Sequence, residues 1–407
     1  MTPSSRSRAG QAAKPAAPAP TPPPGVLFIE QQAAFDDLMR ELAAEPLVAV
    51  DTEAASFHRY HDRIYLIQLS SRTVTAVVDP LGVEDLSALG AVLADPAVEI
   101  LFHDADYDLR LFEQQYGFRA SNLFDTRVAS QLLNEPGIGL AALLEKYLQL
   151  RLDKKYQRAD WSLRPLTTEM LAYAATDTQH LPALRDILRE RLESMGRLEW
   201  AQEEFRHLEQ VRWAAAEDQE PGFLRMKGAK ALRGRALAVL RELFEWREAQ
   251  AKRNDRAAFR VLNNEPMMEM AKTPPTSLDE LRQVKGIGHD FAERRGTELL
   301  RVIEKALALP ESKWPRVERA PRRLPDPAYE ARVDKLKALR NELAAKLELQ
   351  PGVLCPNGTL EAVARAEPKT MTELGAIGEL RRWQLAVIGP ALLGALLELQ
   401  EEEKPEE

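Results

Sequence analysis

The chain has 407 residues, of which 45% are hydrophobic and 29% charged. That is enough for about two to three domains and too apolar for a disordered protein. Its single cysteine, Cys355, excludes an internal disulfide framework and a cysteine-ligated zinc site. The net charge of −8 excludes a uniformly polybasic nucleic-acid binder, and no uninterrupted apolar run approaches the ~18 residues that cross a bilayer. We therefore expect a cytoplasmic protein without a membrane partner, and a monomer.

Residues 1–25 are mainly Pro, Ala and Ser without a continuous apolar segment, which predicts a disordered tail rather than a secretory signal. Five β-rich runs follow, and the turn residues between the first four predict consecutive strands of one sheet. The runs are Val26–Ile29, Leu47–Asp51, Tyr65–Leu69, Val74–Val78 and Glu99–Phe102.

After Asp104 the apolar period becomes helical. Helices are expected around Leu111 and Leu144, and the apolar residues between Thr168 and Leu188 predict one long helix. Strands first and helices later predict an α+β or α/β domain over residues 26–215.

Beyond Pro221 the chain is expected to form two helical units, residues 222–310 and 328–400, with a Pro-rich linker between them and an acidic tail at 401–407. Their shared plan predicts a diverged internal repeat with a period of about 90 residues. Residues 222–323 contain 23 Lys/Arg and 14 Asp/Glu, a local charge of +9 against −17 elsewhere. Such a segment either contacts nucleic acid or is a solvated helical surface.

Three short motifs place carboxylates in the first domain. Asp51 and Glu53 end an apolar strand, and their i, i+2 spacing puts both on one face. Asp108 lies where a helix begins, and Tyr173 and Asp177 share a helical face at i, i+4. Taken singly, each motif has an ordinary explanation: exposed acids at a strand exit, acids favoured by a helix dipole, and a core tyrosine with its hydrogen-bond partner.

The combination is more specific than its parts. Four oxygen ligands without cysteine suit Mg²⁺ or Mn²⁺. Four acids can hold two such ions ~3.5–4 Å apart, the arrangement for in-line displacement at a phosphodiester. Tyr173, facing the same site, is then expected to hold the attacking water in line.

At this point the motifs resemble a known family. Asp51-Thr52-Glu53 followed by Leu66-Ile67-Gln68-Leu69 resembles the first motif of the DEDD 3′→5′ exonucleases. His103 to Leu109 resembles the second motif, in which the last aspartate, Asp108, is the ligand. Tyr173-x-x-x-Asp177 resembles the third in its tyrosine form, DEDDy, and the segment Asp160 to Leu166 is similar to that of ribonuclease D.

The helical units resemble HRDC domains, small nucleic-acid-binding modules, the second more faintly than the first. The resemblance implies a ribonuclease H-like mixed-sheet exonuclease domain followed by two small all-α HRDC-like domains. It also implies trimming of RNA with a single-stranded 3′ end, typically tRNA precursors, with Asp51, Glu53, Asp108 and Asp177 as metal ligands.

Several further residues are candidates for contact with nucleic acid, each with a structural alternative. Where many ribonuclease D sequences have an aromatic residue directly after the first motif, this chain has Ala54, and Phe57 follows three positions later. Phe57 either stacks on a base or packs on the next strand, whereas Asp125 is expected to cap the helix that it precedes. The other candidates are Tyr60, His61, Trp161, Arg164, Arg225, Lys227, Lys230, Arg233, Lys285, Gly286 and Gly288. Burial, ion pairing and tight turns are the alternatives for them.

Two other functions remain open on the sequence. A 3′→5′ DNA exonuclease would use the same metal chemistry, because the motifs do not read the 2′-hydroxyl. A non-catalytic nucleic-acid-binding adaptor would rely on the helical units alone, although all four acids and the tyrosine are present.

Overall fold

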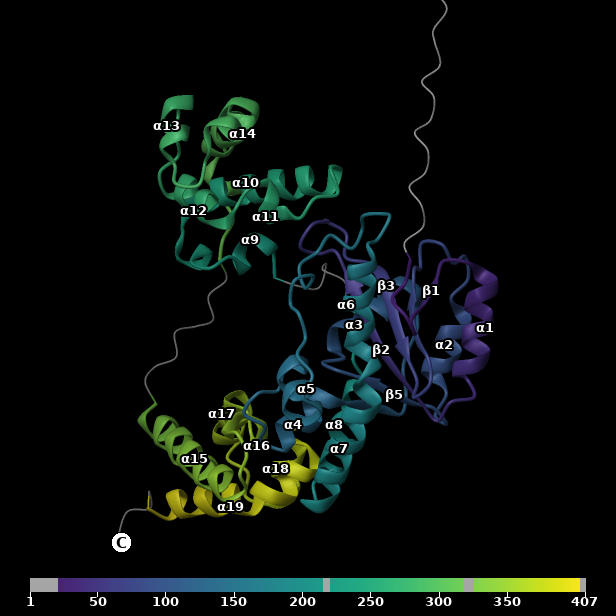
Figure 1. The fold of residues 1–407 in the computed structure, drawn as a ribbon. Helices are drawn as coiled ribbons and strands as arrows, with labels where there is room; N and C mark the ends of the chain where they lie inside the picture. The colour runs from purple at the N-terminus through teal and green to yellow at the C-terminus, as the bar shows by residue number, and fades with distance from the viewer. Residues whose placement is uncertain (1–20, 215–219, 318–325, 403–407) are drawn as a thin grey trace, which may run out of the picture.

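The computed structural model describes residues 21–214, 220–317 and 326–402. Most of the expected N-terminal tail and of the acidic tail at 401–407 lies outside these residues. Figure 1 shows an α/β unit and two separate helical units, one beside each end of the α/β unit.

One mixed sheet of six strands forms the centre of the α/β unit, in the order β1-β4-β3-β2-β5-β6. The strands are β1 Leu27–Ile29, β2 Leu47–Ala54, β3 Ile64–Ser70, β4 Thr75–Val78, β5 Glu99–Phe102 and β6 Leu123–Asp125. β2 pairs antiparallel with β3 and parallel with β5, so it lies inside the sheet and its apolar half is buried. The expected strands are confirmed, but β1 does not lie beside β2: it pairs parallel with β4 at the edge of the sheet.

Eight helices belong to the described part of this unit. They are α1 Gln32–Leu42, α2 Ser87–Ala94, α3 Asp106–Tyr116, α4 Thr126–Leu132, α5 Leu140–Leu148, α6 Thr168–Gln179, α7 Leu181–Ser194 and α8 Leu198–Leu208. The prediction of one long helix from Thr168 was wrong, because the chain breaks at His180 between α6 and α7. Pro182 lies in the first turn of α7, where its missing N–H has no helical partner to lose.

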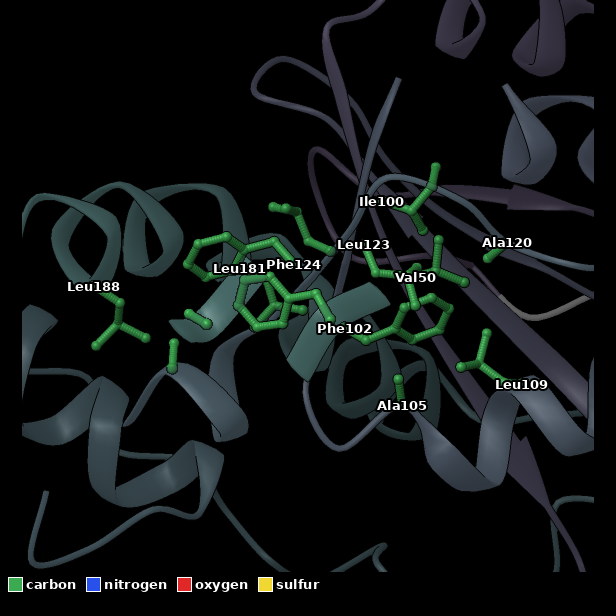
Figure 2. Close-up of a cluster of buried hydrophobic side chains, with 14 of the residues drawn as sticks. Val50, Ile100, Phe102, Ala105, Leu109, Ala120, Leu123, Phe124, Leu181 and Leu188 are labelled. Atoms are coloured by element: carbon green, nitrogen blue, oxygen red, sulfur yellow. The ribbon is translucent and has the colours of Figure 1, made fainter. Parts of the chain in front are cut away.

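The core between the sheet and these helices holds the strand that carries the first motif. Figure 2 shows Val50 of β2 in one cluster of buried side chains with Phe102, Leu109 and Phe124, a cluster that also contains Leu181 and Leu188 of α7. Val50 and Leu188 are fully buried, and each side chain buried in this way contributes roughly 1.5–3 kcal/mol. The end of β2 is therefore held rigidly by the packing of its apolar half.

The first helical unit has a hydrophobic core of its own. It consists of α9 Gly222–Arg225, a short turn at Ala229–Ala231, α10 Gly234–Arg253, α11 Ala258–Val261, α12 Asn264–Lys272, α13 Leu278–Gln283 and α14 His289–Leu307, followed by a turn at Glu311–Lys313. Gly286 has φ of +90° between α13 and α14, a backbone conformation that glycine adopts without strain.

The second helical unit packs on the α/β unit. It consists of α15 Pro327–Lys346, α16 Pro351–Leu354, α17 Asn357–Ala366, α18 Met371–Ala376 and α19 Arg382–Glu402. Trp383 of α19 stacks on Trp200 of α8 with ring centroids 4.8 Å apart, and its indole Nε1 donates to Glu204 Oε1 at 2.8 Å. These contacts fix the unit against α8.

The two helical units repeat the same hydrogen bond between a buried arginine and an asparagine. In the first, the guanidinium of Arg247 donates to Asn264 Oδ1 at 2.6 Å. In the second, Arg340 donates to Asn357 Oδ1 at 2.9 Å, and both residues lie 93 positions after their counterparts. The predicted internal repeat is therefore confirmed by an equivalent interaction.

Helix α19 is the apolar C-terminal helix of this unit. Residues Arg382–Leu399 are long and apolar enough to cross a membrane, by length and composition alone, with a mean hydropathy of 1.2. Ile388, Leu392 and Leu396 of this helix are fully buried in the core that α19 shares with α15 and α8. That packing accounts for part of its apolar character, since 39% of Arg382–Leu399 is buried.

Candidate active site

The first motif lies where β2 leaves the sheet. Asp51 is opposite Gln68 of β3, and Glu53 is opposite Leu66, so the two carboxylates are one strand repeat apart. The pairing register shifts directly after Glu53, at Ala54. This irregularity turns the chain away from the sheet, and the strand thereby ends just beyond its two acids.

Asp108 and Asp177 reach the same region from two helices. Asp108 is in the first turn of α3 and only 6% exposed. The hydroxyl of Thr52, between the two acids of β2, donates to Asp108 Oδ1 and ties α3 to the strand. Asp177 comes from α6, which packs on β2, β3 and β4. The structure thus brings the three predicted motifs together.

The four carboxylates perturb one another. Burial raises the pKa of Asp51 well above its ordinary value, and the charges of Asp108, Asp177 and Glu53 raise it further. Burial, Asp177 and Asp108 do the same to the pKa of Glu53. Burial is also the largest cause that raises the pKa values of Asp108 and Asp177 to about 7.

No described Lys, Arg or His forms an ion pair with any of these four acids, although the same unit contains many paired acids. Neighbouring carboxylates without a positive partner repel each other when charged. The group is therefore a set of oxygen donors without a counter-charge from the described chain.

This donor set fits hard divalent cations. It offers only carboxylate oxygens, the ligands that Mg²⁺ and Mn²⁺ prefer. A cavity of about 420 Å³ is lined by Asp51 and Asp177 together with Tyr173. Among the described residues, no three His, Cys, Asp or Glu side chains stand at metal-ligating distances.

Tyr173 is half-buried at the edge of the same cavity. Its ring lies 6.1 Å from that of Trp161 and 6.0 Å from that of Tyr156, between centroids, which restricts its rotamer. Burial, followed by the charges of Asp177, Glu53 and Asp51, raises the pKa of the phenol. The hydroxyl is therefore protonated at neutral pH and can both donate and accept a hydrogen bond.

Two candidates for RNA contact have structural roles instead. Trp161 is only 1% exposed and packs in the cluster below Tyr173, so it cannot stack on a base. The guanidinium of Arg164 donates to Asp79 Oδ1 and to the carbonyl of Tyr65, both at 2.8 Å, and to the carbonyl of Trp161 at 2.7 Å. Both predictions are corrected, because Trp161 is buried and the N–H donors of Arg164 are taken by bonds within the protein.

Tyr60, His61 and Arg225 do come together, although they are distant in sequence. They line a cavity of about 800 Å³ between the loop after β2 and the first helical unit. Asp255 Oδ1 accepts hydrogen bonds from the backbone N–H groups of Tyr60 and His61, both at 3.2 Å. Burial, and then the charge of Glu248, raise the pKa of the Tyr60 phenol.

The other basic candidates lie on the first helical unit. Lys227 and Lys285 are exposed, whereas Lys230 pairs with Glu220 at 2.8 Å and Arg233 donates to the carbonyl of Lys230 at 2.6 Å. Gly286 and Gly288 belong to the turn before α14, Gly288 as the residue that precedes it. The turn explains Gly286 without a ligand, and contact of these residues with RNA stays a prediction.

Two residues near the site have supporting roles. Asp125 caps α4 as expected, accepting from the N–H groups of Arg127 at 2.8 Å and Val128 at 3.0 Å, and it also accepts from Ala105 at 2.7 Å beside the start of α3. Thr52 was missed in the sequence, because strand alternation directs it away from Asp51 and Glu53. Only its place inside the Asp-Thr-Glu tripeptide could have drawn attention to it.

Comparison with known proteins identifies the family. A family model described as "3'-5' exonuclease" matches residues 26–193, and the HRDC domain model matches residues 236–303 and 330–396. A ribonuclease D of Gluconacetobacter diazotrophicus is 33% identical over 363 residues, which are 88% of this chain and 89% of that protein. Ribonuclease D of Escherichia coli is 34% identical over 283 residues, which are 69% of this chain and 75% of that protein.

Solved structures agree with these matches. Escherichia coli RNase D, titled an exoribonuclease involved in structured RNA processing, superposes with a TM-score of 0.66 and 28% identity, over 92% of this chain and 99% of that chain. A protein from Bifidobacterium adolescentis gives a TM-score of 0.78 at 26% identity, over 91% and 97% of the two chains. They confirm the ribonuclease H-like exonuclease domain followed by two HRDC domains. The chain belongs to the ribonuclease D family and is a 3′→5′ exoribonuclease.

Proposed function

We propose that Asp51, Glu53, Asp108 and Asp177 hold two divalent cations, Mg²⁺ or Mn²⁺, and that the protein removes nucleoside 5′-monophosphates from the single-stranded 3′ end of tRNA precursors. The observation that carries this proposal is the convergence of four carboxylates from β2, α3 and α6 without a described positive partner. Such a group is costly to keep charged unless it binds cations.

When bound, a pair of divalent cations lowers the pKa of water and offsets charge on the attacking and leaving oxygens. The four carboxylates hold that pair from three elements, and Thr52 fixes the orientation of Asp108 through its hydrogen bond. Tyr173, one helical turn before Asp177, hydrogen-bonds the attacking water through its protonated phenol and keeps it in line with the phosphorus.

His103 also lines the cavity, and its imidazole is uncharged at neutral pH. Its Nδ1 lies 2.9 Å from Thr126 Oγ1, and burial, followed by the charge of Arg127, lowers its pKa to about 4. It therefore stays uncharged at neutral pH and does not compensate the carboxylates.

Two observations favour a structured RNA as the substrate. Residues 222–323, which include the first helical unit, have a local charge of +9, suited to the RNA backbone, whereas the rest of the chain has −17. The structure of Escherichia coli RNase D is described as that of an exoribonuclease involved in structured RNA processing.

We further propose that the protein acts in the cytoplasm as a monomer, as expected from its composition.

A 5′-labelled tRNA precursor with a 3′ extension tests the substrate class, alongside a DNA oligonucleotide of the same 3′ sequence. We expect stepwise shortening of the RNA in Mg²⁺ or Mn²⁺, with nucleoside 5′-monophosphates as the released products. Faster shortening of the DNA would favour a DNA exonuclease. RNA affinity that is unchanged by chelator, with no product formed, would favour the adaptor function and refute this proposal.

A further inference from the structure

Two phenylalanines from different domains form an exposed pair beside the site. Phe57 lies in the loop after β2, and Phe259 belongs to α11 of the first HRDC domain. Their ring centroids are 4.9 Å apart, yet the residues remain 40% and 41% exposed. An accessible aromatic pair is not explained by core packing, which would bury both rings.

Arginines surround this pair. The guanidinium of Arg260 lies 5.0 Å from the centroid of the Phe57 ring and 5.8 Å from that of Phe259, and Arg158 lies 5.6 Å from Phe57. Arg260 also lines an adjoining cavity of about 420 Å³ in the HRDC domain. The lining residues are Trp246, Asn254, Arg256, Arg260, Val261, Phe291, Arg294 and Arg295, and no acid is among them.

Two hydrogen bonds to backbone carbonyls hold the two halves of the pair in place. The N–H of Ala257 donates to the carbonyl of His58 at 3.0 Å, and Arg260 Nε donates to the carbonyl of Phe57 at 2.7 Å. The loop and α11 are therefore joined on both sides of the rings. Phe57 is four residues from Glu53, so its Cα is at most about 14 Å from that of the metal-site residue.

We propose that Phe57 and Phe259 form a stacking platform for bases a few nucleotides upstream of the RNA 3′ end, and that the arginine-lined cavity takes the phosphates of the same strand. Exposed rings flanked by cations match the way single strands are bound, by base stacking and backbone attraction. The absence of acids from the cavity lining favours a polyanion over a peptide. The platform rests on the proposed function, since it needs a 3′ end seated at the carboxylates.

Photo-crosslinking tests the location. Full-length protein carrying Asp51→Asn, which prevents cleavage, is mixed with single-stranded RNAs that place 5-iodouridine at successive positions from the 3′ end. We expect a crosslink to Phe57 or Phe259 from a position a few nucleotides upstream, identified by mass spectrometry. Crosslinks that map only to other residues would overturn the proposal.

Affinity measurements in the same background test the role of the rings. Phe57→Leu and Phe259→Leu keep apolar volume but remove the ring face, whereas Phe57→Tyr and Phe259→Tyr retain it. We expect the Leu variants to raise the Kd for RNA about 5- to 150-fold, the equivalent of ~1–3 kcal/mol per stacked base, and the Tyr variants to bind like the parent. Leu81→Ala, at another exposed apolar residue of the catalytic unit, serves as a control with unchanged Kd.

Leu variants that bind like the parent would refute stacking, and equal losses in the Leu and Tyr variants would mean that the rings only join the domains. Failure of the proposed function is seen separately. In that case the protein with intact Asp51 does not shorten the RNA in Mg²⁺ or Mn²⁺, whatever the crosslinks show.

Discussion

Replacing Asp177 with asparagine should stabilise the metal-free protein while abolishing its activity. Burial raises the pKa of Asp177 to about 7, from an ordinary value of 3.8, so the folded state holds the proton more tightly than the unfolded chain. The stability that the protonated carboxyl provides is fully present below about pH 4 and is lost as the pH rises through about 7.

The magnitude follows from this difference. Relative to a pH below about 4, the titration of Asp177 lowers the free energy of unfolding by about 4 kcal/mol above pH 7 and by about 1.5 kcal/mol at pH 5, at about 1.4 kcal/mol per pH unit. The amide of Asp177→Asn is also polar and recovers only part of this cost. We expect a gain of ~2 kcal/mol at pH 8 and less than ~1 kcal/mol at pH 5.

The assay is urea unfolding in EDTA at both pH values, followed by tryptophan fluorescence, to which the buried Trp161 beside Tyr173 contributes. Adding Mg²⁺ or Mn²⁺ at about 100 times its Kd should stabilise the unsubstituted protein by about 2.7 kcal/mol for each ion bound, and the variant by less. Asp186→Asn is the matched control and should lower the stability instead of raising it. Asp186 pairs with Arg72 at 2.7 Å, and this bond lowers the pKa of Asp186, so its charged form stabilises the fold.

A variant that is less stable than the unsubstituted protein in EDTA, by the same amount at pH 5 and pH 8, would refute the reasoning. It would mean that a positive group of the chain already compensates Asp177. The four carboxylates would then already be compensated within the chain and would not require cations.

Three further predictions concern single side chains. Tyr173→Phe should lower kcat by about 10²-fold or more with little change in RNA affinity, because only the water loses its hydrogen bond; single-turnover kinetics and anisotropy measure the two. Thr52→Val removes the hydrogen bond to Asp108 and should weaken Mn²⁺ binding about 10- to 100-fold in calorimetry, and unchanged affinity would exclude that role. Trp383→Ala removes the stack on Trp200 and should raise hydrogen exchange at the contact between α8 and α19, whereas unchanged exchange would show that this stack does not hold the second HRDC domain.

The paired residues of the site could be predicted because the members of each pair are close together in the sequence. Strand alternation places Asp51 and Glu53 on one face, and one helical turn places Tyr173 above Asp177. Each pair follows from periodicity within a few residues, and the order of the motifs resembles one family. That the four acids share one site required the fold, in which α3 and α6 meet the end of β2.

The residues that could not be predicted depend on distant partners. Ion pairing was an open alternative for Arg164, but its partner Asp79 lies 85 residues away and meets it only in the folded chain. Phe57 meets Phe259 across the boundary of two domains, about 200 residues apart. The break at His180 was missed because proline in a first helical turn and proline inside a helix look alike in sequence.

The most direct test of the central claim compares the unsubstituted protein with Asp51→Asn on a 5′-labelled, 3′-extended tRNA precursor, with and without divalent metal. We predict a ladder that shortens from the 3′ end only with metal and only in the unsubstituted protein, while both proteins bind the RNA. Equal shortening by Asp51→Asn, or shortening that persists in chelator, would contradict the assignment of the carboxylates as the metal-dependent catalytic site.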